Sequence, residues 1–399
     1  MAGTADLLVW VADIPAGRLA RQERQRYVFA YSSDDAETAV SLTMPVRLES
    51  WVTPELHPIF QMNLPEGALL EAIRRVIAKI IGDDDLSLLR VTGGNQVGRN
   101  RFSLPGTEAP GLVETVESLD ELLTYPDTVE LFNELVSRYA LRSGISGVQP
   151  KVMLDAAQRG TIVSAGYIVK TWGADYPQLA ANEFFCMTAA KFAGLPVPEF
   201  HLSDNGGLFV MKRFDVNPSN SRPLGFEDMC ALQGVGTSRK YGSTYERVAR
   251  SIRDFVSDRH LMPAREQFFA MLVLSAMVRN GDAHLKNFGV LYPSPSGPVT
   301  LAPVYDVVTT TVYIRQDVPA LSLAGAKKWW PRKQMEQFAV THLSLPVKSV
   351  ARIIDQVSDA VIKAREMIPA YVHDHPEFRD VGERMMAIWE EGVNGLRRP

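Results

Sequence analysis

The sequence contains little cysteine and no apolar run of membrane-spanning length. Cys186 and Cys230 are the two cysteines among 399 residues, and each lies in an apolar, helix-like pattern. Two such residues exclude a disulfide-rich scaffold, so both are expected to be reduced thiols of the core. The longest apolar run, 268–278, is bounded by Glu266 and Arg279 and is shorter than the ~20 residues that span a bilayer. The first residues lack the basic stretch of a signal peptide, so a soluble, cytoplasmic protein with no membrane partner is expected.

An excess of basic residues is also absent. The formal net charge is −4, which gives no sign of a general nucleic-acid-binding surface, although a local basic patch stays compatible with it. A hydrophobic content of 46% and a charged content of 22% are typical of a globular protein. No internal repeat or low-complexity tract occurs. With 399 residues the chain exceeds one ordinary core, so two or three domains are expected.

The first half of the chain is predicted to be rich in strands and the second half in helices. Alternating or β-branched runs predict the strands, with a hairpin turn at Arg159–Gly160, and apolar residues at helical spacing predict the helices. A Gly- and Pro-containing linker is expected at 105–111. The predicted strands are 7–12, 26–31, 151–154, 161–170 and 208–211, and the predicted helices are 68–81, 114–139 with a break near Pro126, 178–192, 244–257, 264–279, 347–367 and 380–391.

Three oxygen-bearing side chains near residue 280 have an informative spacing. Asp282 is followed five positions later by Asn287, and Asp306 follows an expected apolar hairpin over 288–304. Phosphoryl transfer needs one carboxylate to accept the proton of the attacking hydroxyl, and an amide oxygen and a second carboxylate to hold magnesium. The hairpin would return Asp306 to Asn287, so that both could ligate one magnesium ion. The pattern predicts a kinase-type phosphotransferase, although Asn280–Asp282 alone would also fit a helix C-cap and turn.

Further residues fit nucleotide binding, each with a plainer alternative. Lys170 ends an apolar strand run and is either its solvated end or a lysine that contacts the ATP phosphates, oriented by Glu183 on the following helix. The small residues of 143–151 could cradle phosphates through backbone amides or form an ordinary hairpin turn, and they do not make a Walker A loop. His284 lacks a Cys or second His spaced to join it at a metal, so loop support or a nucleotide contact suits it better.

Several segments together resemble the HipA family of bacterial serine/threonine kinases, the toxins of HipA–HipB toxin–antitoxin systems. They follow the family order and extend over nearly the whole chain. The matching segments are 146–151, 182–186, 213–215, 227–230, 281–288 and 302–306, together with 63–67 and a Gly-rich stretch near Gly93. The resemblance implies an α+β, protein-kinase-like two-lobe fold with an additional N-terminal α/β module. The domains expected are an N-terminal module over 1–107, a kinase N-lobe with the phosphate loop over 108–215, and a helical C-lobe over 216–399.

The resemblance also implies a role for each matching side chain. Asp282 would be the catalytic base, Lys170 would contact the ATP phosphates, and Asn287 and Asp306 would bind Mg²⁺. The remaining nucleotide contacts would be the phosphate loop of Ser146, Gly147, Val148, Gln149, Pro150 and Lys151, the hinge of Lys212, Arg213 and Phe214, and the pocket residues His284 and Tyr305.

The partners implied by the resemblance are proteins. Family members phosphorylate a serine of an aminoacyl-tRNA synthetase, such as glutamyl-tRNA synthetase, and thereby block translation. A HipB-like helix-turn-helix antitoxin restrains them, and the complex represses its operon, so that operator DNA is reached through the antitoxin. They also phosphorylate a serine of their own phosphate loop. Gly144 stands where many relatives have that serine, so self-phosphorylation is expected at Ser146 or Ser143, or is lost.

Two other functions fit part of the pattern. The Gly-Asp-x-His-x-x-Asn order from Gly281 also resembles small-molecule kinases of the aminoglycoside and choline type, which would be expected to lack the 146–151 loop and the N-terminal module. A non-catalytic corepressor that acts on DNA through an antitoxin is the second alternative. An active enzyme is favoured over a catalytically inactive one, because Lys170, Asp282 and the two expected magnesium ligands are all present.

Overall fold

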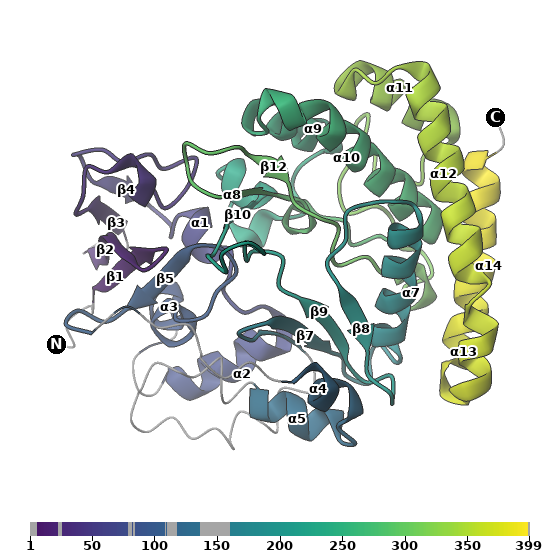
Figure 1. Cartoon of the computed structure of the whole chain (residues 1–399), viewed down its shortest axis with the longest axis horizontal. Coiled ribbons are helices and arrows are strands. Elements are labelled where there is room, and N and C mark those ends of the chain that lie inside the picture. The colour runs from purple at the N-terminus through teal and green to yellow at the C-terminus, as the bar shows by residue number, and fades with distance from the viewer. Residues whose placement is uncertain are drawn as a thin grey trace. The chain divides into compact units, whose positions relative to one another are not determined.

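The computed structural model describes residues 6–22, 26–78, 82, 84–107, 109, 118–135 and 160–397. The chain divides into two compact units, which are described one at a time. Unit 1 comprises 1–173, 203–237 and 291–298, and unit 2 comprises 174–202, 238–290 and 299–399. Figure 1 labels the helices and strands of each unit.

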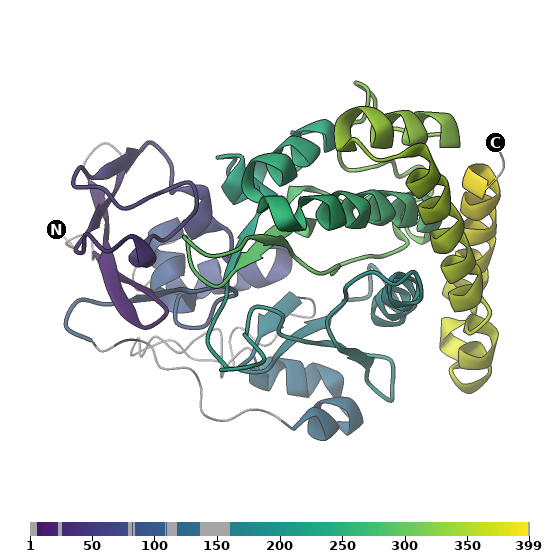
Figure 2. The ribbon, with the colours of Figure 1, turned by 45° about the horizontal axis from the view of Figure 1, so that its top comes forward.

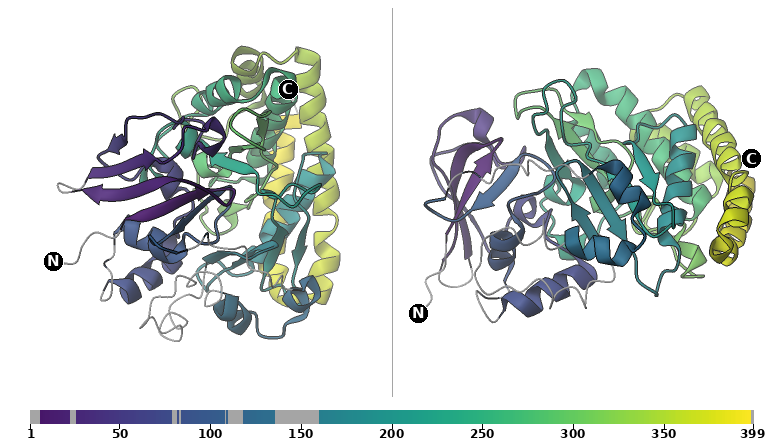
Figure 3. Two further views of the ribbon diagram at one scale, coloured as in Figure 1. Left: turned by 60° about the vertical axis from the view of Figure 1, so that its left-hand side comes forward. Right: turned by 60° about the horizontal axis from the view of Figure 1, so that its bottom comes forward.

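Unit 1 begins with a five-stranded antiparallel sheet of order β4-β3-β2-β1-β5. Figure 3 shows its first strands side by side in purple. In β1 (Leu7–Val11) alternate residues are buried, as expected for a strand with one face on the core. Ala12 and Asp13, with φ of 48° and 68°, form the two-residue turn into the next strand, because left-handed residues match the strand twist. The other strands are β2 (Ile14–Gln22), β3 (Arg26–Tyr31), β4 (Trp51–Thr53) and β5 (Asn100–Ser103), so the strands predicted at 7–12 and 26–31 are confirmed.

The second sheet of unit 1 corrects one prediction. The run 161–170 is not one strand but two, because β6 (Gly160–Val163) turns back into β7 (Tyr167–Thr171). Ser164 closes the turn, since its N–H donates to the Tyr167 carbonyl at 2.7 Å and its Oγ accepts from the Tyr167 N–H at 3.1 Å. Gly160, predicted in a turn, pairs with Thr171 inside the sheet. Apolar residues on both sides of the short turn made the two strands look continuous.

The helices of unit 1 pack on this second sheet, in which β7 also pairs with β9 (Phe209–Lys212). They are α2 (Gly67–Ile77), α3 (Asp85–Thr92), α4 (Leu119–Thr124) and α5 (Thr128–Leu135). Their apolar side chains share one cluster with Ile162, Val169 and Val210 of the sheet. Burying each such side chain contributes about 1.5–3 kcal/mol. Shorter elements of the unit are α1 (Pro58–Gln61), β10 (Gly225–Asp228) and α8 (Met229–Leu232). The three-domain division expected from the sequence stays a prediction.

Unit 2 is mainly helical and is built around α10 (Asp258–Val278), which packs against α12 (Val347–Arg365) and α14 (Arg379–Arg397). Figure 2 shows α12 and α14 side by side at one end of α10. By length and composition α10 could cross a membrane, but 67% of the relevant window is buried inside the protein, as in the core helix of a soluble fold. The other helices and strands of unit 2 are α7 (Leu179–Phe192), β8 (Phe200–Leu202), α9 (Tyr245–Phe255), β12 (Thr300–Leu301), α11 (Arg332–Leu343) and α13 (Ile368–Asp374). The strand β11 (Gly289–Tyr292) has its first two residues in unit 2 and its last two in unit 1.

The predicted helices of unit 2 are found with shifted ends. Helix α10 begins at Asp258 rather than at 264, and Pro263 lies inside the helix. Helix α14 runs on to Arg397, beyond the predicted end at 391.

The crossing of α10 and α14 tolerates only glycine at residue 392. A Cβ on Gly392 would lie 2.0 Å from the Met277 carbonyl oxygen, so Gly392→Ala is expected to lower the free energy of unfolding by about 1–3 kcal/mol. Gly395→Ala is the matched control on the same helix, because nothing lies within 4 Å of its Cβ position. The control should be neutral or stabilising by up to about 1 kcal/mol. Urea unfolding of the two variants measures the difference, and equal stabilities would contradict this packing.

Candidate active site

The loop that follows α10 is held in one conformation by its backbone. Arg279 ends the helix in the left-handed region with φ of 55°, and Asn280 donates its N–H back to the Ser275 carbonyl at 2.8 Å. The Gly281 N–H donates to Thr310 Oγ1 at 2.8 Å. A Cβ on Gly281 would lie 2.0 Å from Asp317 Oδ2, so any larger residue would require the Asp317 side chain to move. The loop therefore presents the next residue, Asp282, from a fixed base.

Asp282 lies three residues past Arg279, the residue that caps the helix. Its side chain is 48% exposed, and its Oδ1 accepts a hydrogen bond from the Tyr241 hydroxyl at 2.7 Å. Burial raises the pKa of the Asp282 carboxyl to about 6, and the Asp306 and Asp317 charges act in the same direction. The Tyr241 hydrogen bond and the Lys240 charge oppose this rise in pKa because they favour the carboxylate.

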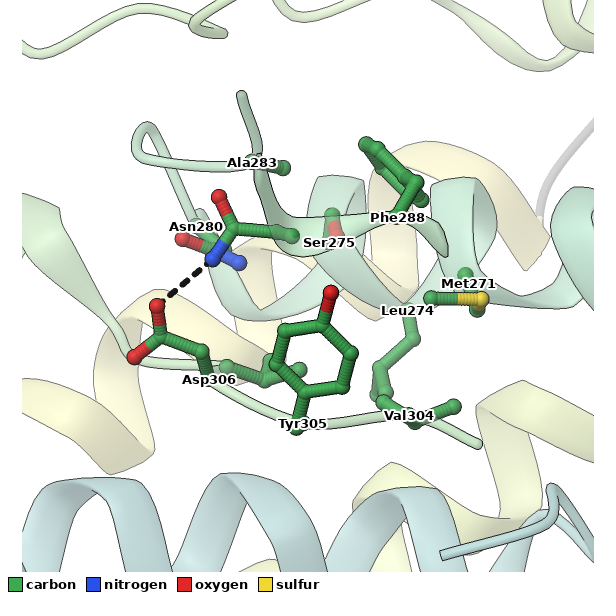
Figure 4. A pocket seen from close by; sticks show the side chains of 11 residues that line it. Met271, Leu274, Ser275, Asn280, Ala283, Phe288, Val304, Tyr305 and Asp306 are labelled. Carbon is green, nitrogen blue, oxygen red and sulfur yellow. Dashed lines mark hydrogen bonds between the residues drawn. The ribbon is translucent and has the colours of Figure 1, made fainter. Parts of the chain in front are cut away.

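Asn287 and Asp306 are brought together as the sequence predicts. The Asn287 Nδ2 donates to Asp306 Oδ2 at 2.6 Å, which is the dashed line in Figure 4. Asn287 is only 4% exposed, and its Oδ1 also accepts from the His284 N–H at 3.0 Å. The expected hairpin exists as β11 and β12, where the Ala302 N–H donates to the Gly289 carbonyl at 2.8 Å. Asp306 itself has φ of 61°, a left-handed conformation that aspartate adopts more readily than most residues.

The segment after Asp306 is anchored by two helices. Asn182 of α7 donates to the Thr309 carbonyl at 3.1 Å and accepts from the Thr309 N–H at 2.8 Å. Trp389 of α14 donates its indole N–H to Thr309 Oγ1 at 2.7 Å. Cys186 is a buried thiol in the same cluster, and burial raises its pKa to about 12, in agreement with the expected core thiol. These contacts explain how a residue as far along the chain as Asp306 is kept in place.

A pocket lies beside the Asn287–Asp306 pair. Figure 4 shows Tyr305 and Asp306 on one side and Ala283 on the other, with apolar side chains of α10 such as Met271 and Leu274 along the wall. The Tyr305 hydroxyl donates to the Lys286 carbonyl at 2.8 Å. His284 is 5% exposed and meets the ring of Tyr241 edge-on at 5.0 Å between centroids. Unit 2 thus gathers five predicted site residues, Asp282, His284, Asn287, Tyr305 and Asp306.

The described donors fit a magnesium ion. Oxygens of carboxylates and amides suit Mg²⁺, which usually takes few protein ligands and completes its shell with water and phosphate. Asn287 Nδ2 faces Asp306 Oδ2 at 2.6 Å, and the Oδ1 of the same amide is the Asn287 atom that would ligate the ion. Within the described ranges no group of three or more His, Cys, Asp or Glu side chains could hold a metal. Ligation by this pair would therefore leave most positions to water and substrate.

Lys170 lies in unit 1 and is not the solvated end of a strand. It is 8% exposed, pairs with Thr161 and Phe209 across β7, and its Nζ lies 5.9 Å from the Phe209 ring centroid. Glu183, the acid expected to orient it, is fully buried on α7 in unit 2. Ser143 and the loop Ser146–Lys151 lie outside the described residues.

The side chains of the predicted hinge, 212–214, lie in different environments. Lys212 is exposed at the end of β9, and the Phe214 ring meets Phe226 edge-on at 5.4 Å between centroids. The Arg213 side chain is buried and does not face a nucleotide, because it pairs with Asp215 and donates to backbone oxygens of Gln96 and Ser164. Its N–H donates to the Gly166 carbonyl at 2.9 Å. A nucleotide contact by Arg213 would therefore depend on its carbonyl oxygen.

Tyr241 is the site residue that the sequence did not reveal. It lies 41 positions before Asp282, in a stretch without a recognisable motif. No periodicity links the two, so only the fold shows that they touch.

Comparisons with known proteins agree with this geometry. A family model described as the HipA-like C-terminal domain matches residues 143–365, and one described as the HipA N-terminal domain matches residues 7–103. The Sinorhizobium fredii protein named "Putative kinase Y4dM" is 26% identical over 96% of this chain and 90% of its own length. "Putative kinase Y4mE" of the same species is 28% identical over 90% and 92%.

Among solved structures, the chain resembles one from Shewanella oneidensis MR-1 described as the toxin–antitoxin system HipA, HipB and its operator DNA complex. The TM-score is 0.66 at 20% sequence identity, over 98% of this chain and 99% of that one. At this identity the likeness concerns the fold. It confirms the expected α+β, protein-kinase-like fold class.

The buried Arg213–Asp215 pair yields a stability prediction. Arg213→Met leaves a buried carboxylate without its partner, so the free energy of unfolding is expected to fall by about 3–5 kcal/mol. Arg18→Met is the control, because Arg18 is 59% exposed and meets Asp6 at 3.4 Å, a pair that contributes about 1 kcal/mol or less. Denaturant unfolding distinguishes the two, and a loss at Arg213 no larger than at Arg18 would show that the pair is not essential.

Proposed function

The chain belongs to the HipA family, and from this premise we propose that it is an ATP- and magnesium-dependent protein kinase that phosphorylates serine or threonine. Two observations within unit 2 carry the proposal: the Asp306 charge acts on the Asp282 carboxyl, and Asn287 meets Asp306 at 2.6 Å. These side chains supply one candidate base and two candidate magnesium ligands, which is the set that phosphoryl transfer requires. The kinase names of the Sinorhizobium fredii relatives support the same activity.

In the proposed mechanism Asp282 Oδ2 accepts the proton of the acceptor hydroxyl while the hydroxyl oxygen attacks the γ-phosphorus of ATP. The bond from the γ-phosphorus to the β,γ-bridging oxygen breaks, and ADP leaves. With a pKa of about 6, Asp282 is mostly ionised near neutral pH and is a stronger base than an ordinary aspartate. Asp306 and Asn287 would hold magnesium, which would neutralise negative charge on the phosphates. The buried Lys170 would contribute a positive charge to the phosphate site. Positioning and charge neutralisation account for most of the catalysis in this class of reaction.

The remaining nucleotide contacts are proposed from the family pattern. Ser146–Lys151 would cradle the phosphates, Lys212–Phe214 would contact adenine through backbone groups, and His284 and Tyr305 would line the pocket. The burial of His284 and the hydrogen bond from Tyr305 to Lys286 support a rigid pocket wall.

The biological setting is also a proposal. The resemblance to a HipA–HipB–operator complex supports a cytoplasmic toxin of a toxin–antitoxin system, restrained by a HipB-like antitoxin and reaching DNA through that partner. The net charge of −4 agrees with indirect DNA contact. An aminoacyl-tRNA synthetase such as glutamyl-tRNA synthetase is the proposed substrate, and Ser146 or Ser143 is the proposed site of self-phosphorylation. The match of residues 7–103 to the HipA N-terminal domain favours this reading over a small-molecule kinase.

Replacing the proposed base tests the function directly. Asp282→Asn keeps the shape of the side chain but removes the proton acceptor, so transfer of radiolabelled γ-phosphate from ATP to proteins of a bacterial lysate should fall at least a hundredfold. The melting temperature should stay close to that of the wild type, because the side chain is half exposed. Phosphate transfer by Asp282→Asn at the wild-type rate would contradict the proposal.

The raised pKa of Asp282 predicts the acidic limb of the pH profile. Since the carboxylate is the active form, kcat/KM for ATP turnover should be constant above about pH 7 and fall about tenfold per pH unit below about 6. An aspartate with an unperturbed pKa would move this limb to about pH 4. Steady-state rates between pH 4.5 and 8, a range chosen as roughly that over which Asp282 and an unperturbed aspartate differ, separate the two cases.

A further inference from the structure

We infer that Tyr241 is a positioning residue that aims the Asp282 carboxylate at the acceptor hydroxyl. The inference rests on the proposed kinase function and goes beyond it by assigning a role to a residue outside every recognised motif. The Tyr241 hydroxyl donates to Asp282 Oδ1 at 2.7 Å, a distance typical of a strong hydrogen bond to a charged acceptor. Both residues belong to unit 2.

The hydrogen bond from Tyr241 engages one carboxylate oxygen of Asp282 and leaves the other for a different contact. Oδ1 accepts from Tyr241, and within the described part of the chain no other side chain donates a hydrogen bond to this carboxylate. Oδ2 is therefore available to an acceptor hydroxyl. Since the side chain is 48% exposed, that hydroxyl can approach from solvent. Tyr241 consequently orients the carboxylate without occupying the oxygen that would take the proton.

Tyr241 is itself held at several points, so its hydroxyl has a defined place. Its ring meets the buried His284 ring edge-on at 5.0 Å, and its carbonyl accepts from Lys327 Nζ at 3.2 Å. The preceding carbonyl, of Lys240, accepts from the Leu285 N–H at 3.2 Å. These contacts fasten the Tyr241 segment to the residues just after Asp282 and to Lys327.

A second tyrosine strengthens this attachment. The Tyr245 hydroxyl donates to the Ala283 carbonyl at 3.1 Å, next to Asp282, and its N–H donates to the Ser322 carbonyl at 3.0 Å. The segment from Lys240 to Tyr245 thus touches the loop at Asp282, Ala283 and Leu285. A half-exposed aspartate would otherwise sample several rotamers, and misplacing a catalytic group by about 1 Å can cost about a hundredfold in rate.

The charged groups around Asp282 pull its carboxylate in different directions, so a hydrogen bond is needed to orient it. The groups that act on its carboxylate are Tyr241, Lys240, Asp306 and Asp317, with the His284 ring 4.0 Å away. Lys240 attracts the carboxylate, while the two aspartates repel it. A neutral hydroxyl donor fixes the direction of the carboxylate between these opposing influences.

Tyr241→Phe tests the inference in the full-length chain, because it removes the hydroxyl and keeps the ring against His284. The assay is ADP release from ATP with Mg²⁺, with water as the acceptor, so that no protein substrate is needed. We expect kcat to fall about tenfold with KM for ATP unchanged, since the nucleotide contacts stay intact. The acidic limb of the profile should move to higher pH, because a donor that favours the carboxylate is lost.

Tyr371→Phe on α13 is the matched control, because its hydroxyl has no hydrogen-bond partner among the described residues. It should match the wild type in kcat and in its pH profile. Unchanged kcat and pH profile in Tyr241→Phe would overturn the inference. A faster Tyr241→Phe would also overturn it, because the hydroxyl would then block the base.

Asp282→Asn in the same assay separates this inference from the proposed function. If Asp282→Asn turns over ATP at the wild-type rate, the kinase mechanism fails and the role of Tyr241 fails with it. If Asp282→Asn is inactive while Tyr241→Phe equals the wild type, only the inference about Tyr241 fails. Equal melting temperatures of the variants exclude unfolding as the cause of a loss.

Discussion

The hydrogen bond between Asn287 and Asp306 is the contact on which the site in unit 2 depends. This hydrogen bond joins the loop after α10 to the segment after β12. Along the chain, the short β11–β12 hairpin connects the same two segments. Asp306 adopts a left-handed backbone conformation that costs energy in isolation. The contacts of Thr309 with Asn182 and Trp389 offset that cost because they fix the backbone three residues later. The helices α7 and α14 thereby determine where Asp306, the proposed metal ligand, lies.

Buried polar contacts have a comparable role within unit 1. Asp215 accepts from the Gly98 N–H at 2.7 Å, while Arg213 donates to the Gln96 carbonyl. Glu227 is fully buried and accepts from Ser41, from the Leu42 N–H and from Tyr292, and burial raises its pKa. These bonds connect residues of the HipA N-terminal domain match with later strands of the chain. Because a buried charge without partners is strongly unfavourable, such contacts favour one arrangement of these segments over others.

Prediction from the sequence succeeded where a feature depends on residue type and on residues close to one another along the chain. The strand 26–31 was predicted correctly because its pattern is local, and Asp306 was correctly placed near Asn287 because a hairpin has limited reach. The run 161–170 was predicted wrongly as one strand, since a three-residue turn between two apolar strands leaves little trace in the pattern. The sequence did not show that the Arg213 side chain donates to the Gln96 carbonyl, because that partner lies 117 positions earlier in the chain.

By itself the sequence determined the identity and spacing of Asp282, Asn287 and Asp306, because these depend only on residue type and on the reach of a hairpin. It also determined the family, because several segments occur in a fixed order. Only the tertiary structure decided that Lys170 is buried and that Tyr241 touches Asp282. It also decided that the pKa of Asp282 is about 6, with burial as the main cause. Burial and long-range contact arise from segments that meet after folding, and no local pattern encodes them.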